Sequence, residues 1–437
     1  MKATRIALAS LVVVALGGSV LLRGTDPSQL RTDGDAPDGP VTTVVPPAPG
    51  DADGSGGAAR PSGAGSANAG ATSTTAAPST TTPPPPPPTT GPPTTTPTRA
   101  RDELGRPVWT PAVDSSGGSD VSGAMAGFLA GVPDGSTIDL RAGGRYRMES
   151  TWVIAGRRDL TIRGNGATVF ATTPGDLMRA NVRIANSSGI TVRDLVIKGA
   201  NPTAGAKDRI YRPERGGQHG IDVNSSRGVS LVGVTVTDTY GDFVYLGQRD
   251  GGAPTDGVLI QGSTFARSGR QGITLTAARN VIVETSSITE PKRSMFDFEP
   301  GRGAGNAVDG VTIRNNRASH GPLLFIAAEG HGPVDHVTIQ GNTLTGMTLN
   351  IAMEDLDGGV RRAWKVLHNT GDLLSGNPHG ATMRFVRING LDVRGNTQTM
   401  KPDRDMVGVG TTNSCNLTVT ANSFPNSVGQ LRATGTC

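Results

Sequence analysis

The sequence predicts an all-β solenoid of about ten coils with one helix at its N-terminal end. Three observations lead to this fold class. Short strands of alternating apolar and polar residues recur along the chain, their spacing is nearly constant, and one amphipathic helix precedes them. Glycine makes up 62 of the 437 residues but follows no Gly-X-Y period, which excludes collagen.

The first part of the chain is not expected to fold. Lys2 and Arg5 precede an apolar run over 6–22, so we interpret residues 1–23 as an export signal, either cleaved or kept as a membrane anchor. The first 104 residues contain 17 of the 31 prolines and no Phe, Tyr or Trp. This composition predicts a disordered linker over 24–104 and a folded domain over 105–437.

One helix is predicted at the start of the folded domain, over residues 120–130. Ser119 and Asp120 are good N-cap residues, and Met125 and Leu129 follow at helical spacing. A solenoid leaves the backbone groups of its first coil unpaired, so we expect this helix to cover that open edge.

The repeat consists of short strands with a common pattern. Its copies span 160–165, 190–195, 234–239, 258–263, 281–286, 311–316, 337–342, 391–396 and 417–422, with a weaker copy at 365–369. The asparagines that end the later copies are residues 316, 342, 369, 396 and 422, so the steps are 26, 27, 27 and 26 residues. We interpret these asparagines as a structural ladder of hydrogen bonds inside the solenoid.

The stretch from 119 to 171 gives this solenoid a family resemblance. A cap helix, Val132-Pro133-Asp134-Gly135, a strand and Gly164-Asn165-Gly166 follow one another there. This order resembles the right-handed parallel β-helix, or pectin-lyase-like, superfamily of exported carbohydrate-active proteins, and the resemblance covers roughly 115–425. It implies a right-handed parallel β-helix firmly and a reaction only loosely.

A second strand precedes the asparagine unit in each coil. Alternation places apolar pairs such as Phe296 and Phe298 inside and the residues between them outside. The predicted outer column is Asp222, Tyr245, Thr274, Asp297, Phe325, Asn350 and Arg384, and the next column includes Asn224 and Glu299. Acids, arginines and an aromatic ring therefore gather on one outer face, as a polymer-binding site requires.

Asp297 and Glu299 are the strongest catalytic candidates on this face. Two residues apart on one strand, they lie on the same side with Cα atoms about 6.6 Å apart. Neighbouring carboxyl groups push their pKa values apart, so that one can donate a proton while the other stays charged. The alternative is a solvated acidic pair bound to Arg270 or Arg293.

The remaining candidates support this pair. Asp222 and Asp242 are predicted to assist catalysis, although a lone outward Asp is often only solvated. The predicted substrate-binding residues are His219, Tyr245, Arg270, Arg293 and Arg384. An insertion at 199–217, with Lys207, Arg209, Arg212 and Arg215, is either a loop overhanging the face or a plain long loop.

Polygalacturonase motifs match only in part. Residues 218–222 carry His219 where the family has its catalytic Asp, and Asp242 stands alone where the family has Asp-Asp. Gly330-His331-Gly332 follows several coils too late, and no Arg-x-Lys stands in place. We conclude that the chain is not a conventional polygalacturonase.

No cofactor or metal motif is present in the sequence. His331 and His336 lack zinc-binding spacing. If the protein were a lyase with Arg384 as base, the predicted acids could hold calcium: Asp222, Asp242, Asp297 and Glu299.

The sequence therefore favours an exported enzyme that cleaves an extracellular or cell-envelope polysaccharide, by glycoside hydrolysis rather than as a lyase. A non-catalytic surface protein that binds glycans or serves as a spacer is the other hypothesis. The net charge of +4 weakly favours an anionic polymer, and clustered Lys and Arg among stacking aromatics, which a nucleic-acid binder needs, are absent from the sequence.

The two cysteines, Cys415 and Cys437, are expected to form one disulfide. Both lie near the end of a chain predicted to be exported, where disulfides persist. This bond would hold the C-terminal tail over the last coil.

Overall fold

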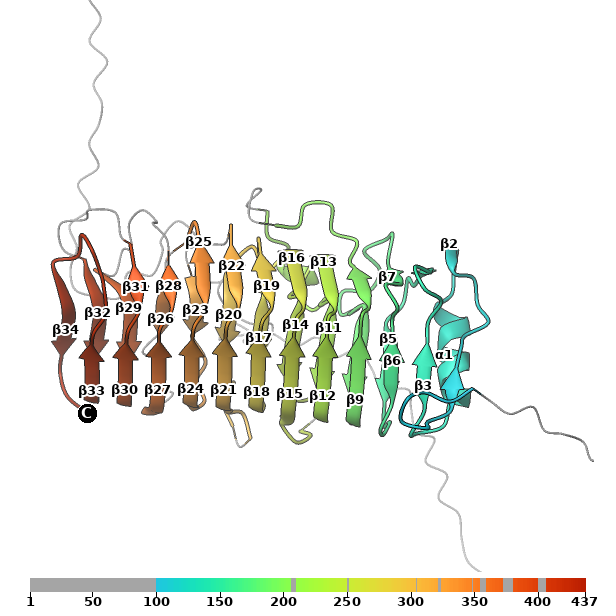
Figure 1. Cartoon of the computed structure of the whole chain (residues 1–437), viewed down its shortest axis with the longest axis horizontal. Coiled ribbons are helices and arrows are strands. Elements are labelled where there is room, and N and C mark those ends of the chain that lie inside the picture. The colour runs from blue at the N-terminus through green and yellow to red at the C-terminus, as the bar shows by residue number, and fades with distance from the viewer. Residues whose placement is uncertain are drawn as a thin grey trace, which may run out of the picture. The chain divides into compact units, whose positions relative to one another are not determined.

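The computed structural model describes residues 100–205, 210–249, 251–303, 305–320, 324–347, 349–353, 359–371, 380–399 and 406–437. The predicted signal or anchor and almost all of the predicted linker lie outside these residues. The described chain winds into a right-handed parallel β-solenoid of about eleven coils, which confirms the predicted fold class (Figure 1).

Each coil contributes strands to three parallel sheets. The first sheet, of 12 strands, contains β1 (Val108–Trp109), β3 (Thr137–Asp139), β6 (Thr161–Arg163), β9 (Ser188–Arg193), β12 (Arg227–Val232), β15 (Thr255–Gln261), β18 (Ala278–Glu284), β21 (Val308–Arg314), β24 (Val334–Gln340), β27 (Arg361–Leu367), β30 (Ile388–Arg394) and β33 (Cys415–Thr420). The copy predicted at 234–239 falls in the second sheet instead, and β12 takes its place in the first.

The second sheet has 11 strands and runs beside the first (Figure 1). It contains β2 (Ser116–Asp120), β4 (Arg145–Arg147), β7 (Thr168–Phe170), β10 (Val196–Lys198), β13 (Thr235–Thr239), β16 (Thr264–Ser268), β19 (Ser287–Thr289), β22 (Arg317–Ser319), β25 (Thr343–Thr345), β28 (Thr370–Gly371) and β31 (Thr397–Gln398). Most of these strands are short because the chain turns sharply on both sides of them.

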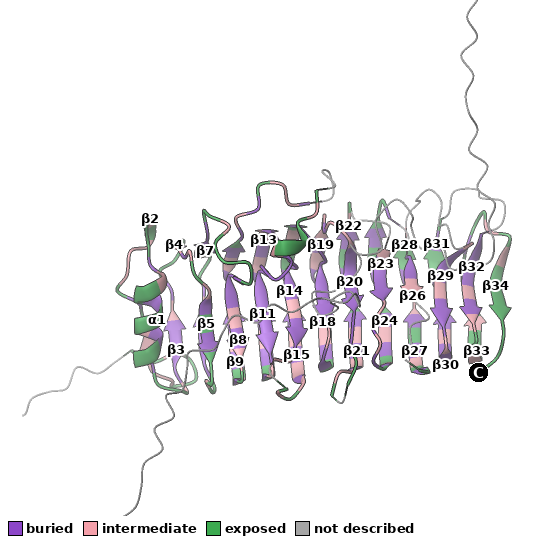
Figure 2. Cartoon of the chain, turned by 180° about the vertical axis from the view of Figure 1, so that it is seen from behind, coloured by how far each residue is buried: buried purple, intermediate pink, exposed green. Residues whose placement is uncertain are grey.

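The third sheet also has 11 strands and holds the predicted site. It contains β5 (Trp152–Ala155), β8 (Val182–Ala185), β11 (Ile221–Asn224), β14 (Val244–Gly247), β17 (Ile273–Leu275), β20 (Ser294–Phe298), β23 (Leu324–Ala328), β26 (Ile351–Met353), β29 (Ala381–Val386), β32 (Val407–Thr412) and β34 (Gly429–Thr434). Figure 2 shows this sheet largely buried in the middle coils, whereas β34 at one end is exposed.

The interior is filled by the alternating apolar residues that the sequence predicts. Phe296 and Phe298 are fully buried. The ring of Phe298 lies 6.0 Å from that of Trp364, which in turn lies 6.1 Å from that of Phe385, both in edge-on contacts. These aromatic contacts join residues of different strands through the core.

The predicted asparagine ladder is present at the turn between the first and second sheets. The side-chain amides of Asn316, Asn342, Asn369 and Asn396 each donate to the amide oxygen of the next asparagine, at 2.8–3.0 Å, and Asn422 ends the series. Each of these amides also donates to a backbone carbonyl, for example Asn342 to Ile313 at 2.9 Å. The ladder thus satisfies the polar groups of a turn that is buried in four of its coils.

The residue before each ladder position explains the rest of the repeat pattern. Its backbone is left-handed, with φ of 55° at Asn315, 64° at Gly341, 54° at His368 and 66° at Gly395. Glycine and asparagine tolerate this conformation best, which accounts for the Gly-Asn and Asn-Asn endings of the strands.

The predicted helix is α1 (Ser122–Gly131), which packs Met125 and Leu129 into the core at the N-terminal end of the stack (Figure 1). Its start differs from the prediction, since the N-cap residue is Val121 and makes no side-chain cap. Asp120 instead ends β2 and accepts a 3.0 Å hydrogen bond from the Ser122 amide. The sequence pattern placed the helix correctly but misplaced its cap by one residue.

A disulfide lies near one end of the described chain, and a hydrogen-bonded carboxylate lies near the other. Cys415 and Cys437 form the predicted disulfide, with Cα atoms 5.5 Å apart. At the other end, the Asp102 carboxylate accepts hydrogen bonds from Thr137 at 2.5 Å and from Arg106 at 2.8 Å. Among the described residues, no helix is long and apolar enough to cross a membrane.

Candidate active site

The predicted acidic column forms along the third sheet in the middle coils. Asp222 lies in register with Tyr245, Tyr245 with Thr274, and Thr274 with Asp297. Because neighbouring strands of a sheet are about 4.8 Å apart, these four side chains follow one another along the solenoid axis.

The prediction is wrong for the two coils after Asp297. There Asp297 pairs with Ala327, and Ala327 pairs with Ala352. Phe325 and Asn350, which were predicted to hold these two positions, lie two residues before them in the chain. Phe325 is buried, with its ring 5.4 Å from that of Phe296. A shift of two residues keeps the alternation of faces, which is why the sequence pattern did not reveal it.

The face predicted to be exposed is in fact buried. Asp222, Asp242 and Asp297 are 0% exposed, and Arg270 and Glu299 are 3% and 6% exposed. The alternative of an exposed acidic pair is wrong in its exposure, but its contact with Arg270 is present, at 3.1 Å from Glu299.

The insertion at 199–217 covers part of this face. Lys292 Nζ donates to the carbonyl oxygens of Thr203 at 3.0 Å and Ile210 at 2.6 Å, and the Arg293 guanidinium lies 5.0 Å from the centre of the Tyr211 ring. The described parts of the insertion thus overhang the coil that carries Asp297. Its predicted basic residues Lys207 and Arg209 lie outside the described residues.

Arg270 links the acids of two different coils. Its Nη1 lies 3.0 Å from Asp242 Oδ2, and its Nη2 lies 3.1 Å from Glu299 Oε2. Burial acts to lower the pKa of Arg270, but the charges of Asp242 and Glu299 outweigh it and raise that pKa well above its usual value. This buried arginine stays charged and fixes both carboxyl groups.

Asp297 occupies an unusual position within this network. Neither of its carboxyl oxygens accepts a hydrogen bond from an N–H or O–H donor of the described residues, although both are buried. Burial and the nearby charges of Glu299 and Glu329 raise the pKa of Asp297 well above its ordinary value. The raised pKa favours the neutral, protonated form of Asp297, and the two carboxyl groups influence each other's ionisation.

The Glu299 carboxyl behaves differently from that of Asp297. Burial raises its pKa, but the positive charge of Arg270 opposes the rise and keeps Glu299 the more acidic partner. Asp297 and Glu299 therefore form one acidic pair, in which each carboxyl acts on the ionisation of the other.

Glu329 is a member of the cluster that the sequence analysis missed. Its backbone amide donates to the Phe298 carbonyl at 3.2 Å, which places it beside Glu299 on the next coil. The correct register of β23 would have revealed it, because Ala327 and Glu329 then align with Asp297 and Glu299.

Asp222, Tyr245 and His219 lie on neighbouring coils. The Asp222 carboxylate is contacted by Arg183 at 2.8 Å and by Arg249 at 3.0 Å. The Tyr245 ring stacks on that of His219 at 4.6 Å, and burial raises the Tyr245 pKa. These stacked rings contact one another, so neither is an open platform for a sugar in this conformation.

His219 also joins the buried network, with its Nδ1 accepting a 3.1 Å hydrogen bond from the Asp242 amide. Arg384 does not join it. Its strand, β29, is three strands beyond β20 in the third sheet, and its Nη1 donates to the Met353 carbonyl at 3.3 Å. The prediction that Arg384 acts together with the acids is wrong.

The Gly330-His331-Gly332 motif has a structural explanation. A Cβ atom at Gly330 would lie 2.2 Å from Pro300 Cδ, and one at Gly332 would lie 2.4 Å from the Asn306 carbonyl oxygen. Only glycine permits the loops after β20 and β23 to approach this closely.

A calcium site formed by the four predicted acids has no support in their contacts. Asp222, Asp242 and Glu299 are paired with arginines, and burial raises the pKa of Asp297. The described residues contain no group of three or more His, Cys, Asp or Glu placed to hold a metal ion.

Comparisons with known proteins agree with the architecture. The family model described as "Right handed beta helix region" matches residues 180–436. No curated protein sequence matches the chain.

Three solved structures illustrate the likeness. A family 28 exopolygalacturonase of Yersinia enterocolitica is 11% identical, with a TM-score of 0.53 over 76% of this chain and 78% of its own. An endo-xylogalacturonan hydrolase of Aspergillus tubingensis is 13% identical, with a TM-score of 0.53 over 75% and 93%. PfbA, a surface adhesin of Streptococcus pneumoniae, is 12% identical, with a TM-score of 0.52 over 73% and 89%. Identities this low show a shared fold alone.

Proposed function

This chain belongs to the right-handed β-helix family, and from that premise we propose that it is an exported enzyme that hydrolyses a polysaccharide at its buried acid cluster. The observation that carries the proposal is the Asp297 carboxyl, which is buried without a donor among the described residues and whose pKa is raised by burial and by Glu299 and Glu329. A carboxyl group kept neutral in this way is a proton donor suited to glycosidic oxygen. The apolar stretch near the N-terminus supports export.

The roles follow from the network around Arg270. Asp297 gives its proton to the oxygen of the leaving sugar as the glycosidic bond breaks. Asp242, fixed by Arg270 and by the Gln271 amide at 2.8 Å, takes a proton from the attacking water. Glu299, paired with Arg270 at 3.1 Å, stays charged, and its charge raises the pKa of Asp297 before reaction. Asp242 and Asp297 belong to coils two steps apart, about 10 Å along the axis, and Arg270 of the coil between them occupies this interval until substrate binds.

Substrate must reach groups that are now covered. The contacts of Lys292 with Thr203 and Ile210, and of Arg293 with Tyr211, hold the insertion over the coil of Asp297. In this proposal a polysaccharide displaces the insertion, and Arg293 then turns from Tyr211 to the polymer.

The experiment that tests the proposal uses the full-length chain and a panel of polysaccharides. Reducing ends report hydrolysis, and absorbance of unsaturated uronates reports elimination. We expect hydrolysis of at least one polymer, and Asp297→Asn should lower turnover by about 10²–10⁴-fold with folding intact. Asp309→Asn is the matched control, because Asp309 is an exposed acid paired with His336 at 2.7 Å. Full activity in Asp297→Asn would refute the assigned role.

One observation favours a second candidate, a non-catalytic glycan-binding surface protein. The acids are fully covered, and the adhesin PfbA has the same fold. If no polymer in the panel is cleaved but one binds, this second function replaces the first. A lyase with Arg384 as base has less support, because that arginine lies three coils from Asp297.

A further inference from the structure

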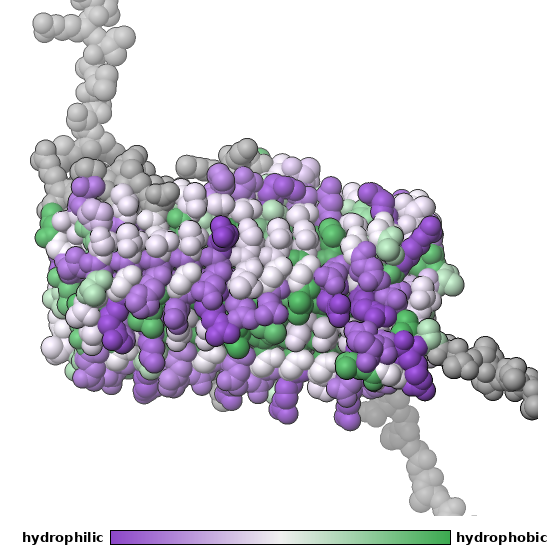
Figure 3. All heavy atoms as spheres, in the orientation of Figure 1, coloured by the Kyte–Doolittle hydropathy of each residue, from purple (hydrophilic) through white to green (hydrophobic). Residues whose placement is uncertain are grey.

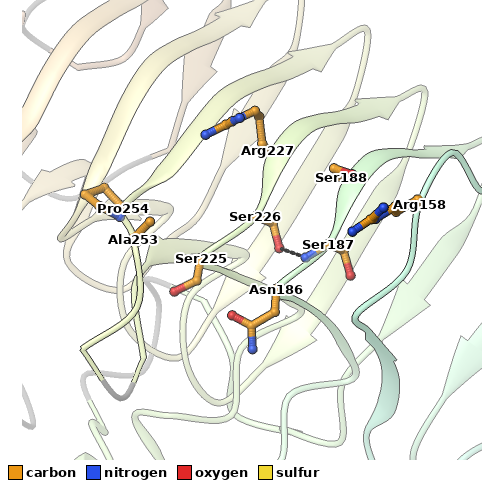
Figure 4. Close-up of a pocket in the computed structure, with 9 residues that line it drawn as sticks. All are labelled: Arg158, Asn186, Ser187, Ser188, Ser225, Ser226, Arg227, Ala253 and Pro254. Carbon is orange, nitrogen blue, oxygen red and sulfur yellow. Dashed lines mark hydrogen bonds between the residues drawn. The ribbon is translucent and has the colours of Figure 1, made fainter.

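A polar pocket lies apart from the acid cluster, where the third sheet turns into the first. It has a volume of about 350 Å³ and is lined by Arg158, Asn186, Ser187, Ser188, Ser225, Ser226, Arg227, Ala253 and Pro254. Figure 4 shows Arg158 and Arg227 on either side of the segment formed by Ser187 and Ser188. This volume lies within the range of about 300–1,000 Å³ that small-molecule sites occupy.

The pocket carries two positive charges without a lining carboxylate. No described carboxylate lies within 4.0 Å of either guanidinium, and the nearest acid to Arg227 along the sheet, Asp256, accepts a 2.8 Å hydrogen bond from Asn280. Asp134 is paired with Arg157 at 2.8 Å, accepts a hydrogen bond from the Arg158 backbone amide and interacts with the Arg158 charge at longer range. Two guanidinium groups are therefore available to an anion from solvent.

The polar groups around these arginines divide into two kinds. The hydroxyls of Ser187 and Ser226 are buried and donate to the backbone carbonyls of Ala185 and Asn224, at 2.8 and 2.9 Å, so they hold the turn together. Ser188 and Asn186 make no side-chain hydrogen bond to another described residue. Their donors line the pocket and suit the hydroxyl groups of a sugar ring.

We propose that this pocket binds the anionic group of an acidic saccharide, with Arg158 and Arg227 contacting the oxyanion and Asn186 and Ser188 the ring hydroxyls. Guanidinium groups bind carboxylates and sulfates through charge-assisted, often bidentate hydrogen bonds. The inference deepens the proposed function, because it names the class of polymer.

The pocket is connected to the face that carries the acids. Arg249 donates from its backbone amide to Ser225 Oγ at 3.4 Å and from its side chain to Asp222 at 3.0 Å. The same coil carries Tyr245 on β14. One polymer can therefore extend from the acid cluster to the pocket along neighbouring coils.

Calorimetric titration of the full-length chain tests the proposal. The probes are trigalacturonate, its methyl ester, and a trisaccharide without carboxyl groups that carries one sulfate. We expect trigalacturonate or the sulfated sugar to bind, the methyl ester to bind at least about tenfold more weakly, and the affinity to fall with salt. The two anionic probes distinguish a carboxylate ligand from a sulfate ligand.

Variants decide whether the pocket is responsible. Arg158→Gln and Arg227→Gln should each weaken binding about tenfold or more. Arg279→Gln should leave it unchanged, because Arg279 is an exposed arginine one step beyond Asp256 in the same row and does not line the pocket. Equal affinity for the acidic sugar and its ester, or no effect of both pocket variants, would overturn the proposal.

The same titration in Asp297→Asn separates this inference from the proposed function. Binding to the pocket requires no proton donor, so affinity should persist in that variant. Loss of turnover with retained, arginine-dependent binding would support both proposals. Retained binding in a chain that cleaves no polymer would support the pocket alone.

Discussion

Two buried polar columns in this solenoid have opposite properties. In the asparagine ladder every amide both donates and accepts, as Asn342 does with Asn369 at 2.8 Å and with the Ile313 carbonyl at 2.9 Å. In the acid cluster, Asp297 has no donor among the described residues, and burial together with the charges of Glu299 and Glu329 raises its pKa. Both columns are covered, but only the ladder has complete hydrogen bonding.

The difference separates structural from functional polar residues. Burying a polar group costs little when it is hydrogen-bonded and several kcal/mol when it is not. A column whose side chains hydrogen-bond to one another therefore contributes to stability. A buried carboxyl group without a hydrogen-bond donor lowers stability. Functional sites often lower the stability of the fold in this way.

The largest expected change in stability comes from a substitution in the asparagine ladder. Asn369→Ala removes an acceptor for the amide and side chain of Asn342 and a donor to the Ile339 carbonyl. We expect the free energy of unfolding to fall by about 3–5 kcal/mol, because several buried groups lose partners. Asn422→Ala, at the partly exposed end of the ladder, should cost clearly less. Denaturant titration of both variants checks this, and equal losses would contradict a cooperative ladder.

The acid cluster should respond to pH in a way that the ladder does not. The folded-state pKa of Asp297 is raised, so above about pH 4 the folded protein keeps a proton that the unfolded chain has lost. The free energy of unfolding should therefore decrease with rising pH, by up to about 1.4 kcal/mol per pH unit, until Asp297 ionises.

Asp297→Asn should remove this decrease and be the more stable protein at neutral pH. Denaturant titrations of both proteins between pH 4 and 8 provide the measurement. Parallel curves would show that Asp297 is not protonated in the folded state.

A smaller effect is expected at Glu329. Its charge is one of the causes that raise the pKa of Asp297, so Glu329→Gln should lower that pKa. If the enzyme proposal holds, the alkaline limb of the pH–rate profile should move to lower pH while activity at the optimum is mostly retained. An unchanged profile would mean that Glu329 does not act on Asp297.

The smallest effect concerns the N-terminal boundary, where neither column is touched. A chain that begins at residue 100 should melt like the full-length protein, because Asp102 keeps its contacts with Thr137 and Arg106. A chain that begins at residue 105 should melt a few degrees lower at most. Calorimetry of both chains checks this, and aggregation of the first would show that the linker is needed for folding.

The solenoid and the asparagine ladder could be predicted from the sequence alone, because both repeat along the chain. Steps of 26 and 27 residues between the asparagines indicate the coils, and Gly-Asn endings reveal a left-handed turn that few residues tolerate. The disulfide was also predictable, since Cys415 and Cys437 have no other possible partner in the chain.

The details of the site were not predictable to the same degree. A shift of two residues in β23 preserves the alternation, so Phe325 was placed on the wrong side and Glu329 was missed. Burial of the acids depends on contacts of Tyr211 and Lys292 that bring an insertion across the face, and no local pattern encodes such contacts. The sequence predicted which residue types form the site, but their burial and their contacts follow only from the folded structure.

We expect the Asp297 carboxyl to be protonated in the folded protein at neutral pH. Infrared difference spectroscopy of the wild-type protein against Asp297→Asn at pH 7 tests it directly, because a protonated carboxyl and a carboxylate absorb in different bands. We expect a carboxylic-acid band in the wild type that the substitution removes. A difference spectrum in which Asp297→Asn removes only a carboxylate band would contradict it.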